Sequence, residues 1–212
     1  RGGKELMAQT KKGPSAADVK ALREATGAGM MDCKAALEES GGDMDEAVKI
    51  LRKKGAASAA KRGGRGTSEG IVASYVHNPP TKGALVEVQC ETDFVARTDE
   101  FQAFAREVAI HITAIAPTHV SPEDIPEEER EREREILTEK AKADGKPDNV
   151  VEKIVEGQLK KWAGERALLE QQHFNTEKHE SKTISEMVTD VAAKTGENVR
   201  IARFSRFEVG EE

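Results

Sequence analysis

The chain has 212 residues, of which 37% are hydrophobic and 34% are charged, and this apolar fraction is sufficient to build a folded core. Its formal net charge of −6 argues against a general nucleic-acid coat protein, and no apolar run approaches the roughly 18 residues that a membrane span requires. At about 150 residues per domain, the length indicates one ordinary domain with a small one, or two modest domains.

The first residues are polar and lack the apolar segment of a signal peptide. Met7-Ala8-Gln9 resembles a natural start, so we expect residues 1–14 to be disordered, or non-native in Arg1–Leu6.

The two cysteines, Cys33 and Cys90, are too few for a disulfide scaffold and follow apolar patterns, which predicts buried thiols in a reducing cytoplasm. No metal site is expected, because the histidines form no ligand-spaced cluster with either cysteine.

Charge divides the chain near residue 66. Residues 1–66 hold 14 basic and 9 acidic residues, a net charge of +5, which leaves 19 basic and 30 acidic residues, or −11, for the remainder. The junction Lys61-Arg62-Gly63-Gly64-Arg65-Gly66 follows an Ala/Ser/Gly-rich stretch. We therefore expect a basic, flexible linker over residues 56–69.

Three short helices are predicted before this linker, over residues 15–55. Apolar residues share one face of the first helix, which ends at Gly27, and Met30, Cys33 and Leu37 share a face of the second. Asp43 and Glu46 form a capping-box-like start for the third helix, which is expected to end at Gly55. A three-helix unit of this size binds a partner more often than it catalyses a reaction.

The period changes after the linker, and a core over residues 70–212 is predicted. Residues 71–76 and 86–91 alternate as two strands of a hairpin, and residues 101–115 follow the spacing of an amphipathic helix that Pro117 ends. A helical hairpin is expected over about 126–162, and then a helix over 184–192 that stops at Gly196. A last strand over 199–207, alternating throughout, extends the hairpin into a small antiparallel sheet, so the fold class is α+β.

Enzyme motifs are missing from the sequence. There is no P-loop, no Gly-x-Gly-x-x-Gly after a strand and no His-Glu-x-x-His, and acid pairs such as Glu91 and Asp93 are best interpreted as solvated carboxylates. The basic run Arg52–Arg65 could neutralise phosphates, but no aromatic residues interleave to stack bases, so nucleic-acid binding stays a minority hypothesis. A purely structural role through self-association of the hairpin is the other alternative.

The segment Glu91–Arg97 joins the second strand to the strongest helix and therefore lies on a corner. Thr92 suits a helix N-cap and Asp93 suits the positive end of the helix dipole. Phe94 is not on the apolar face of the helix that follows. Spacing leaves two interpretations open, a side chain packed into the sheet edge or an exposed aromatic held on a rigid corner, as in a binding hot spot.

Two ordered motifs carry a family resemblance. Residues 22–34, LREATGAGMMDCK, followed by residues 91–97, ETDFVAR, closely resemble translation elongation factor Ts. Residues 152–157 and 203–210 agree with the same family, and the likeness runs from about Ser15 to the C-terminus. The length resembles the compact bacterial form.

The resemblance implies a nucleotide exchange factor for elongation factor Tu, which is not an enzyme and acts in the cytoplasm. It implies an N-terminal three-helix domain of ubiquitin-associated type and a core with a protruding helical hairpin. By analogy, Thr92, Asp93, Phe94 and Val95 disturb the magnesium site of the partner, and Arg23, Met30, Met31, Arg206 and Phe207 contact the partner. Pairing of compact members implies a homodimer, and no membrane or cofactor is implied.

Overall fold

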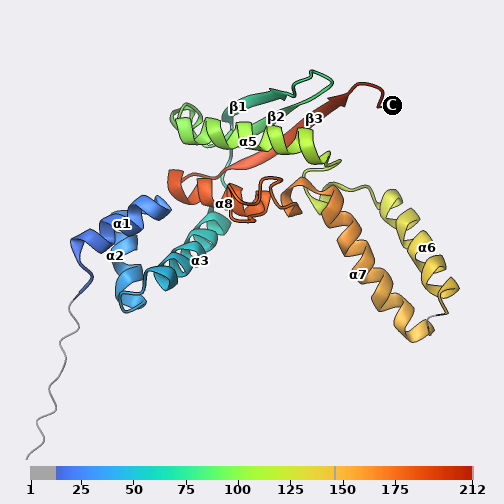
Figure 1. The fold of residues 1–212 in the computed structure, drawn as a ribbon, viewed down its shortest axis with the longest axis horizontal. Coiled ribbons are helices and arrows are strands. Elements are labelled where there is room, and N and C mark those ends of the chain that lie inside the picture. The colour runs from blue at the N-terminus through green and yellow to red at the C-terminus, as the bar shows by residue number, and fades with distance from the viewer. Residues whose placement is uncertain (1–12, 146, 212) are drawn as a thin grey trace, which may run out of the picture. The chain divides into compact units, whose positions relative to one another are not determined.

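The computed structural model describes residues 13–145 and 147–211, and the chain divides into two units, residues 1–61 and 62–212 (Figure 1). The expected N-terminal extension falls on residues 1–12, which lie outside the described residues, and on Gly13 and Pro14. Among the helices that the structure describes, none combines the length and the apolar composition needed to cross a membrane.

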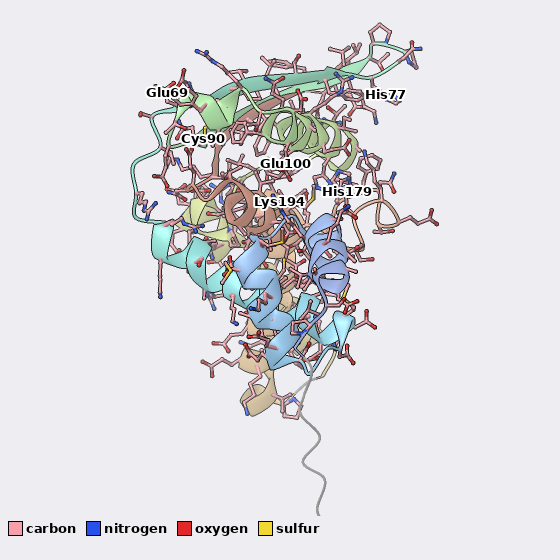
Figure 2. The ribbon with its side chains drawn as sticks, turned by 90° about the vertical axis from the view of Figure 1, so that its left-hand side faces the viewer. Glu69, His77, Cys90, Glu100, His179 and Lys194 are labelled. Atoms are coloured by element: carbon pink, nitrogen blue, oxygen red, sulfur yellow. The ribbon has the colours of Figure 1, made fainter. Side chains whose placement is uncertain are left out.

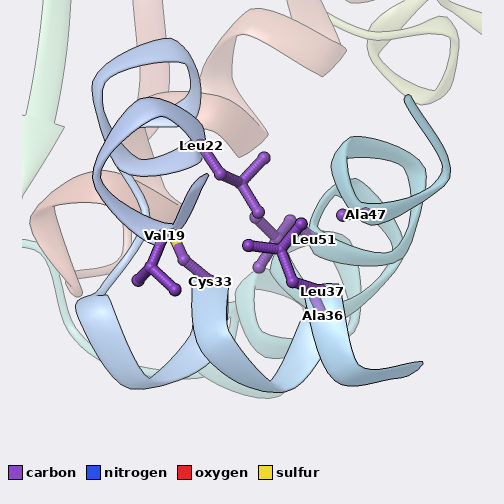
Figure 3. Packing of buried hydrophobic residues seen from close by; sticks show 7 residues of the cluster. All are labelled: Val19, Leu22, Cys33, Ala36, Leu37, Ala47 and Leu51. Carbon is purple, nitrogen blue, oxygen red and sulfur yellow. The ribbon is translucent and has the colours of Figure 1, made fainter. Parts of the chain in front are cut away.

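The first unit contains three helices, α1 (Ala16–Thr26), α2 (Met30–Glu39) and α3 (Met44–Arg62). A capping box between Ser15 and Asp18 begins α1, and Gly27 ends it with a φ of 69°, a left-handed conformation that suits glycine. Small and branched apolar side chains fill the space between the helices (Figure 3): the core consists of Val19, Leu22, Cys33, Ala36, Leu37, Ala47 and Leu51. The three predicted helices are confirmed.

The third helix extends further than the sequence pattern indicates. We expected an end at Gly55 and a flexible linker from residue 56, but α3 continues to Arg62. Four alanines between residues 56 and 60 explain the difference, because alanine has the highest helix propensity and outweighs a single glycine. The residues that follow are held by side-chain hydrogen bonds: Asn198 Nδ2 donates to the carbonyl of Arg65 over 2.9 Å, and Thr67 Oγ1 donates to Gln89 Oε1 over 3.1 Å.

The second unit is built on a three-stranded antiparallel sheet in the order β1-β2-β3. The strands are β1 (Glu69–Val76), β2 (Lys82–Cys90) and β3 (Arg200–Glu208), as the alternating patterns predicted. The central strand β2 alternates a buried face, which includes Val86, Val88 and Cys90, with a more exposed one. One face of the sheet therefore supports the core.

The last strand departs from simple alternation. Its register against β2 shifts between Glu87 and Val88, so that Ala202 is an extra residue in β3. A bulge of this kind reverses the facing of the residues beyond it. Ile201 and Phe204 consequently lie opposite the buried residues Val88 and Val86, where strict alternation had assigned them to different faces.

Helix α5 (Asp99–Ile115) packs against β1 and β2, and α8 (Ile184–Thr195) packs against α5 (Figure 1). The predicted apolar face of α5 is buried at Phe101, Phe104, Val108 and Ile112. An ion pair of 2.7 Å between Lys194 and Glu100, both labelled in Figure 2, links the ends of α8 and α5. The α+β class with helices packed on a small antiparallel sheet is confirmed.

A helical hairpin interrupts the chain between α5 and α8. It consists of α6 (Glu127–Ala143) and α7 (Asp148–Arg166), flanked by the short 3-10 helices η1 (Pro122–Asp124) and η2 (Leu168–Glu170). The two long helices run side by side and bury Ala141, Val151 and Val155 between them (Figure 1). The acidic start of α6 is solvent-exposed at Glu127, Glu128 and Glu129, which agrees with the interpretation of this run as a solvated helix face.

Candidate functional site

The corner between β2 and α5 is formed by a single-turn helix, α4 (Asp93–Ala96). Thr92 is its N-cap, and the Thr92 hydroxyl oxygen accepts a hydrogen bond from the backbone N–H of Val95 over 3.4 Å. Thr98 then caps α5 in the same way, by accepting from the N–H of Phe101. Two consecutive caps confine the turn to a short, well-defined path between a buried strand and a buried helix.

Phe94 projects into solvent from this corner. Its exposed fraction is 78%, whereas Ala96 on the same turn is buried. The interpretation in which Phe94 packs into the sheet edge is therefore wrong, because Ala96 and not Phe94 faces the core. An aromatic ring that is exposed on a rigid support has few conformations to lose on binding, which suits a hot spot.

Asp93 lies beside Phe94 and forms an ion pair with Arg97 one turn later, with 2.9 Å between Arg97 Nη2 and Asp93 Oδ2. The Arg97 side chain is exposed and the Asp93 side chain is partly exposed, so the pair contributes little to stability. The carboxylate remains accessible to a partner that offers a competing cation or hydrogen-bond donor.

Glu197 holds the corner from the far end of the sequence. Its Oε2 accepts hydrogen bonds from the backbone N–H groups of Glu91 and Thr92, each 3.0 Å long, and its Oε1 accepts from the Thr92 hydroxyl over 2.6 Å. In return, Glu91 Oε1 accepts from the N–H of Asn198 over 2.6 Å. The loop after α8 and the corner before α4 thus form a reciprocal hydrogen-bonded contact, hereafter the Glu197 contact.

Both cysteines are buried as predicted. The Cys90 thiol lies directly behind the corner and donates to the carbonyl of Thr92 over 3.2 Å. Burial raises the pKa of the Cys90 thiol, and burial also raises the pKa of Cys33. Both groups therefore stay protonated at neutral pH and act as small packing residues.

In the first unit, Arg23, Met30 and Met31 lie around the loop between α1 and α2. Arg23 is exposed near the end of α1, and the methionines begin α2 with exposed fractions of 49% and 75%. The expected sharing of one apolar face by Met30, Cys33 and Leu37 is therefore incomplete, because Met30 is outside the buried core. Two exposed methionines in succession offer an adaptable apolar contact.

Arg206 and Phe207 are neighbours in β3, but they differ in their surroundings and lie far from the corner. Arg206 lies opposite the buried Ala84, and carboxylates of Glu208 and Glu211 pair with its guanidinium. Phe207 lies opposite Gly83 and is 70% exposed. Gly83 precedes Cys90 by seven residues, which at about 3.3 Å per residue places Phe207 roughly 23 Å along the sheet from the corner.

Sequence reasoning missed two groups of residues that the fold assembles. Glu197 contacts Thr92 across a separation of 105 residues, and no spacing rule connects them. Glu107, His173 and His179 also converge, in a cluster that could hold a metal ion. The spacing on α5 could have singled out Glu107, which is polar and lies three residues after the buried Phe104, next to the apolar face of the helix.

Comparison with known proteins gives a consistent result. The family model for Elongation factor TS matches residues 4–211. The elongation factor Ts of Carboxydothermus hydrogenoformans is 55% identical over 193 residues, which cover 91% of this chain and 88% of that protein. The elongation factor Ts of Thermosipho melanesiensis is 50% identical over 197 residues, 93% of this chain and 99% of that protein.

The elongation factor Ts of Thermotoga neapolitana is 52% identical over 194 residues, which cover 92% of this chain and 96% of that protein. Matches of this extent cover both units and the corner, and they agree with the resemblance that residues 22–34 and 91–97 carry. The chain belongs to the elongation factor Ts family.

Proposed function

We propose that this chain releases GDP from elongation factor Tu by disturbing the magnesium site of that partner with the corner Thr92–Val95. Membership of the elongation factor Ts family implies a nucleotide exchange factor for elongation factor Tu that acts by binding and not by catalysis. Our proposal adds the residues that cause GDP release and the mechanism by which they act. In this role the chain would function in the cytoplasm, at the elongation step of protein synthesis.

The exposure of Phe94 is the observation that carries this proposal. The ring is 78% exposed although it lies between a buried strand and a buried helix, and such an arrangement has no benefit for the stability of the isolated chain. On contact with a nucleotide-binding domain, Phe94 would act as a wedge and Asp93 would compete for groups around the cation. Thr92 and Val95 hold the turn that presents them.

The mechanism follows from the charge of the ion. Magnesium is often the largest local charge in a phosphate site, and its octahedral geometry at 2.0–2.1 Å tolerates little displacement. A shift of its ligands therefore weakens nucleotide binding. The coupling is reciprocal, so nucleotide weakens the binding of the exchange factor by the same factor, and entry of GTP releases the exchange factor.

Further contacts would supply affinity. We assign this role to Arg23, Met30 and Met31 of the first unit and to Arg206 and Phe207 at the far end of β3. The solvent exposure of the two methionines and of Phe207 supports this assignment. Arg206 already has two carboxylate partners, so its contribution requires exchange of one of them for a group of the partner.

Stopped-flow release of a fluorescent GDP from elongation factor Tu tests the wedge. For Phe94→Ala at saturating concentration, we expect release at least about tenfold slower, equivalent to about 1.4 kcal/mol in the barrier. Affinity for elongation factor Tu should change much less. Ile136→Ala, which removes an exposed apolar side chain from α6, is the matched control and should release GDP at the wild-type rate. A wild-type rate for Phe94→Ala would refute the wedge.

A further inference from the structure

A cluster of two histidines and one carboxylate lies between α5 and the segment that precedes α8. Glu107 extends from the middle of α5, and His173 and His179 come from the segment between η2 and α8, where Figure 2 labels His179. Glu107 Oε2 is 3.1 Å from His179 Nε2 and 3.6 Å from His173 Nε2. One candidate ligand atom from each of the three residues lies within 4.8 Å of the others.

The cluster is shielded from solvent. His173 is fully buried, and the side chains of Glu107 and His179 are largely buried. The two imidazole rings lie close, with 4.1 Å between their centroids, and the Nε2 atom of each lies near the Glu107 carboxylate. Polar side chains that converge in a buried position indicate a binding site more strongly than exposed ones do, because a buried polar group needs a partner.

The distances suit a tetrahedral ion. Zinc binds imidazole nitrogen and carboxylate oxygen at about 2.0–2.2 Å, which places neighbouring ligand atoms of a tetrahedral site roughly 3.4 Å apart. The observed 3.1 Å and 3.6 Å bracket this separation. Two imidazoles and one carboxylate favour zinc, cobalt or nickel over magnesium or calcium, which prefer all-oxygen sites.

We propose that Glu107, His173 and His179 form a binding site for a divalent metal ion of the zinc class. Glu107 Oε2 and the Nε2 atoms of the two histidines supply three ligands, and a water completes the tetrahedron. The ion would link the segment before α8 to the middle of α5. This site is independent of the exchange function proposed for the corner.

The ammonium group of Lys178 and the present hydrogen bonds of His173, whose Nε2 lies 3.4 Å from the carbonyl oxygen of Glu107, oppose metal binding. Lys178 Nζ lies 2.6 Å from Glu107 Oε1, so its ammonium group would stand next to the bound cation. His173 Nδ1 accepts the N–H of Asn175 over 3.2 Å, and coordination through Nε2 moves the proton of the neutral ring to Nδ1, which removes that hydrogen bond. Both effects predict a modest affinity for the metal ion, and substitution of Lys178 tests the first of them.

Equilibrium titration of the untagged full chain with Zn²⁺, after removal of metal by a chelator, measures the site directly. We expect one equivalent of Zn²⁺ to bind, no competition from excess Mg²⁺, and a visible absorption band of tetrahedral Co²⁺ when cobalt replaces zinc. Glu107→Gln and His179→Ala should each weaken binding by about tenfold or more, because each removes one of three ligands. His77→Ala, which removes an exposed histidine just after β1, is the matched control and should bind like the wild type.

Lys178→Ala should increase the affinity for Zn²⁺, a result that partial unfolding of the variant would not produce. Removal of the ammonium group frees Glu107 and takes a like charge away from the cation, so we expect Zn²⁺ to bind severalfold more tightly. Circular dichroism of each variant checks that the fold is retained. The proposal is overturned if the wild-type chain binds no stoichiometric zinc, if His179→Ala binds as the wild type does, or if Lys178→Ala does not tighten binding.

Discussion

Glu197 is the residue on which the geometry of the corner depends most. Its two carboxylate oxygens accept two backbone N–H groups and the hydroxyl of the N-cap Thr92. Hydrogen bonds to a charged acceptor contribute about 1.5–3 kcal/mol each, more than the neutral cap itself. We infer that Glu197 is a positioning residue, which acts on the partner only through the orientation of Thr92–Val95.

Substitution of Glu197 separates positioning from affinity. Glu197→Ala removes both acceptor oxygens and all three hydrogen bonds, and we expect GDP release from elongation factor Tu to slow by roughly tenfold at saturation. Glu197→Gln keeps one acceptor oxygen and should recover part of the rate. Stopped-flow release at several concentrations of exchange factor measures both the maximal rate and the half-saturating concentration.

The control for Glu197 is Lys194→Ala, three residues earlier, which removes only the surface ion pair with Glu100. This variant should keep the wild-type rate. If Glu197→Ala lowered the melting temperature but left the maximal rate unchanged, Glu197 would have a merely structural role and the assignment would be wrong.

His111 makes stability depend on pH. It is buried between Gln171, whose Oε1 is 2.9 Å from Nε2, and the N–H of Phe174, which donates to Nδ1 over 3.1 Å, and its ring faces that of His173. Burial lowers the pKa of His111 from 6.5 to about 4. A lowered pKa in the folded state means that the unfolded chain takes up the proton first as pH falls.

The contribution of neutral His111 is therefore complete above pH 6.5 and is lost between pH 6.5 and about 4. Between pH 7.5 and pH 5.0 we expect its share of the free energy of unfolding to fall by about 2 kcal/mol. Denaturant unfolding at the two pH values, with a chelator present, measures the loss. His111→Gln should reduce this difference, and an equal difference in both proteins would contradict the assignment.

At the scale of the element, sequence patterns predict the segments that have strong local signals. Helix α5 has an apolar face with helical spacing, and its end at Ile115 agrees with the stop expected at Pro117, whereas its cap Thr98 was not predicted. Segments with competing local signals are less predictable. Gly55 is outweighed by the alanines that follow it, and the bulge at Ala202 has no marker in β3.

The site was predictable only where it is local. Residues 91–97 form a corner because a strand pattern meets a helix pattern there, and Thr92 is a recognisable cap. The direction of Phe94 depends on how Ala96 packs against the core, which spacing does not specify. Glu197 and the cluster of Glu107, His173 and His179 depend on tertiary contacts between segments far apart in the chain.

Gly70 in β1 is required by the close approach of β2. Its φ of 151° is unusual for residues with a side chain, and a Cβ atom would lie 2.2 Å from the carbonyl oxygen of Val88. Gly70→Ala should therefore separate the strands locally and lower the free energy of unfolding by roughly 2 kcal/mol or more. Denaturant unfolding followed by circular dichroism measures this loss.

Gly157→Ala is the matched control for Gly70→Ala. Gly157 lies inside α7, and nothing lies within 4 Å of the position that an alanine methyl group would occupy, so alanine meets no obstacle there. The better helix propensity of alanine should raise stability by about 0.5–1 kcal/mol. Equal effects of the two substitutions would show that the close approach at Gly70 does not constrain the sheet.

At the scale of the whole molecule, the two units differ in core and in charge. Among the residues that the structure describes, the buried core of the first unit lies between Val19 and Leu51. Residues 1–61 carry 12 basic and 9 acidic residues, a net charge of +3, which leaves −9 for residues 62–212. We infer a division of roles, in which the first unit supplies affinity for the partner and the second unit supplies exchange.

Removal of the first unit tests this division. In a chain that begins at Arg62, the corner and the Glu197 contact are retained, so the maximal rate of GDP release should stay within about twofold of the wild type, below 0.5 kcal/mol in the barrier. The half-saturating concentration should rise by about tenfold or more, because the partner contacts that we propose for Arg23, Met30 and Met31 would be lost. The full-length variant Arg23→Ala/Met31→Ala should show a smaller increase of the same kind, since both side chains are exposed and the helices remain intact. If the truncated chain saturated at the wild-type concentration, the first unit would not bind the partner.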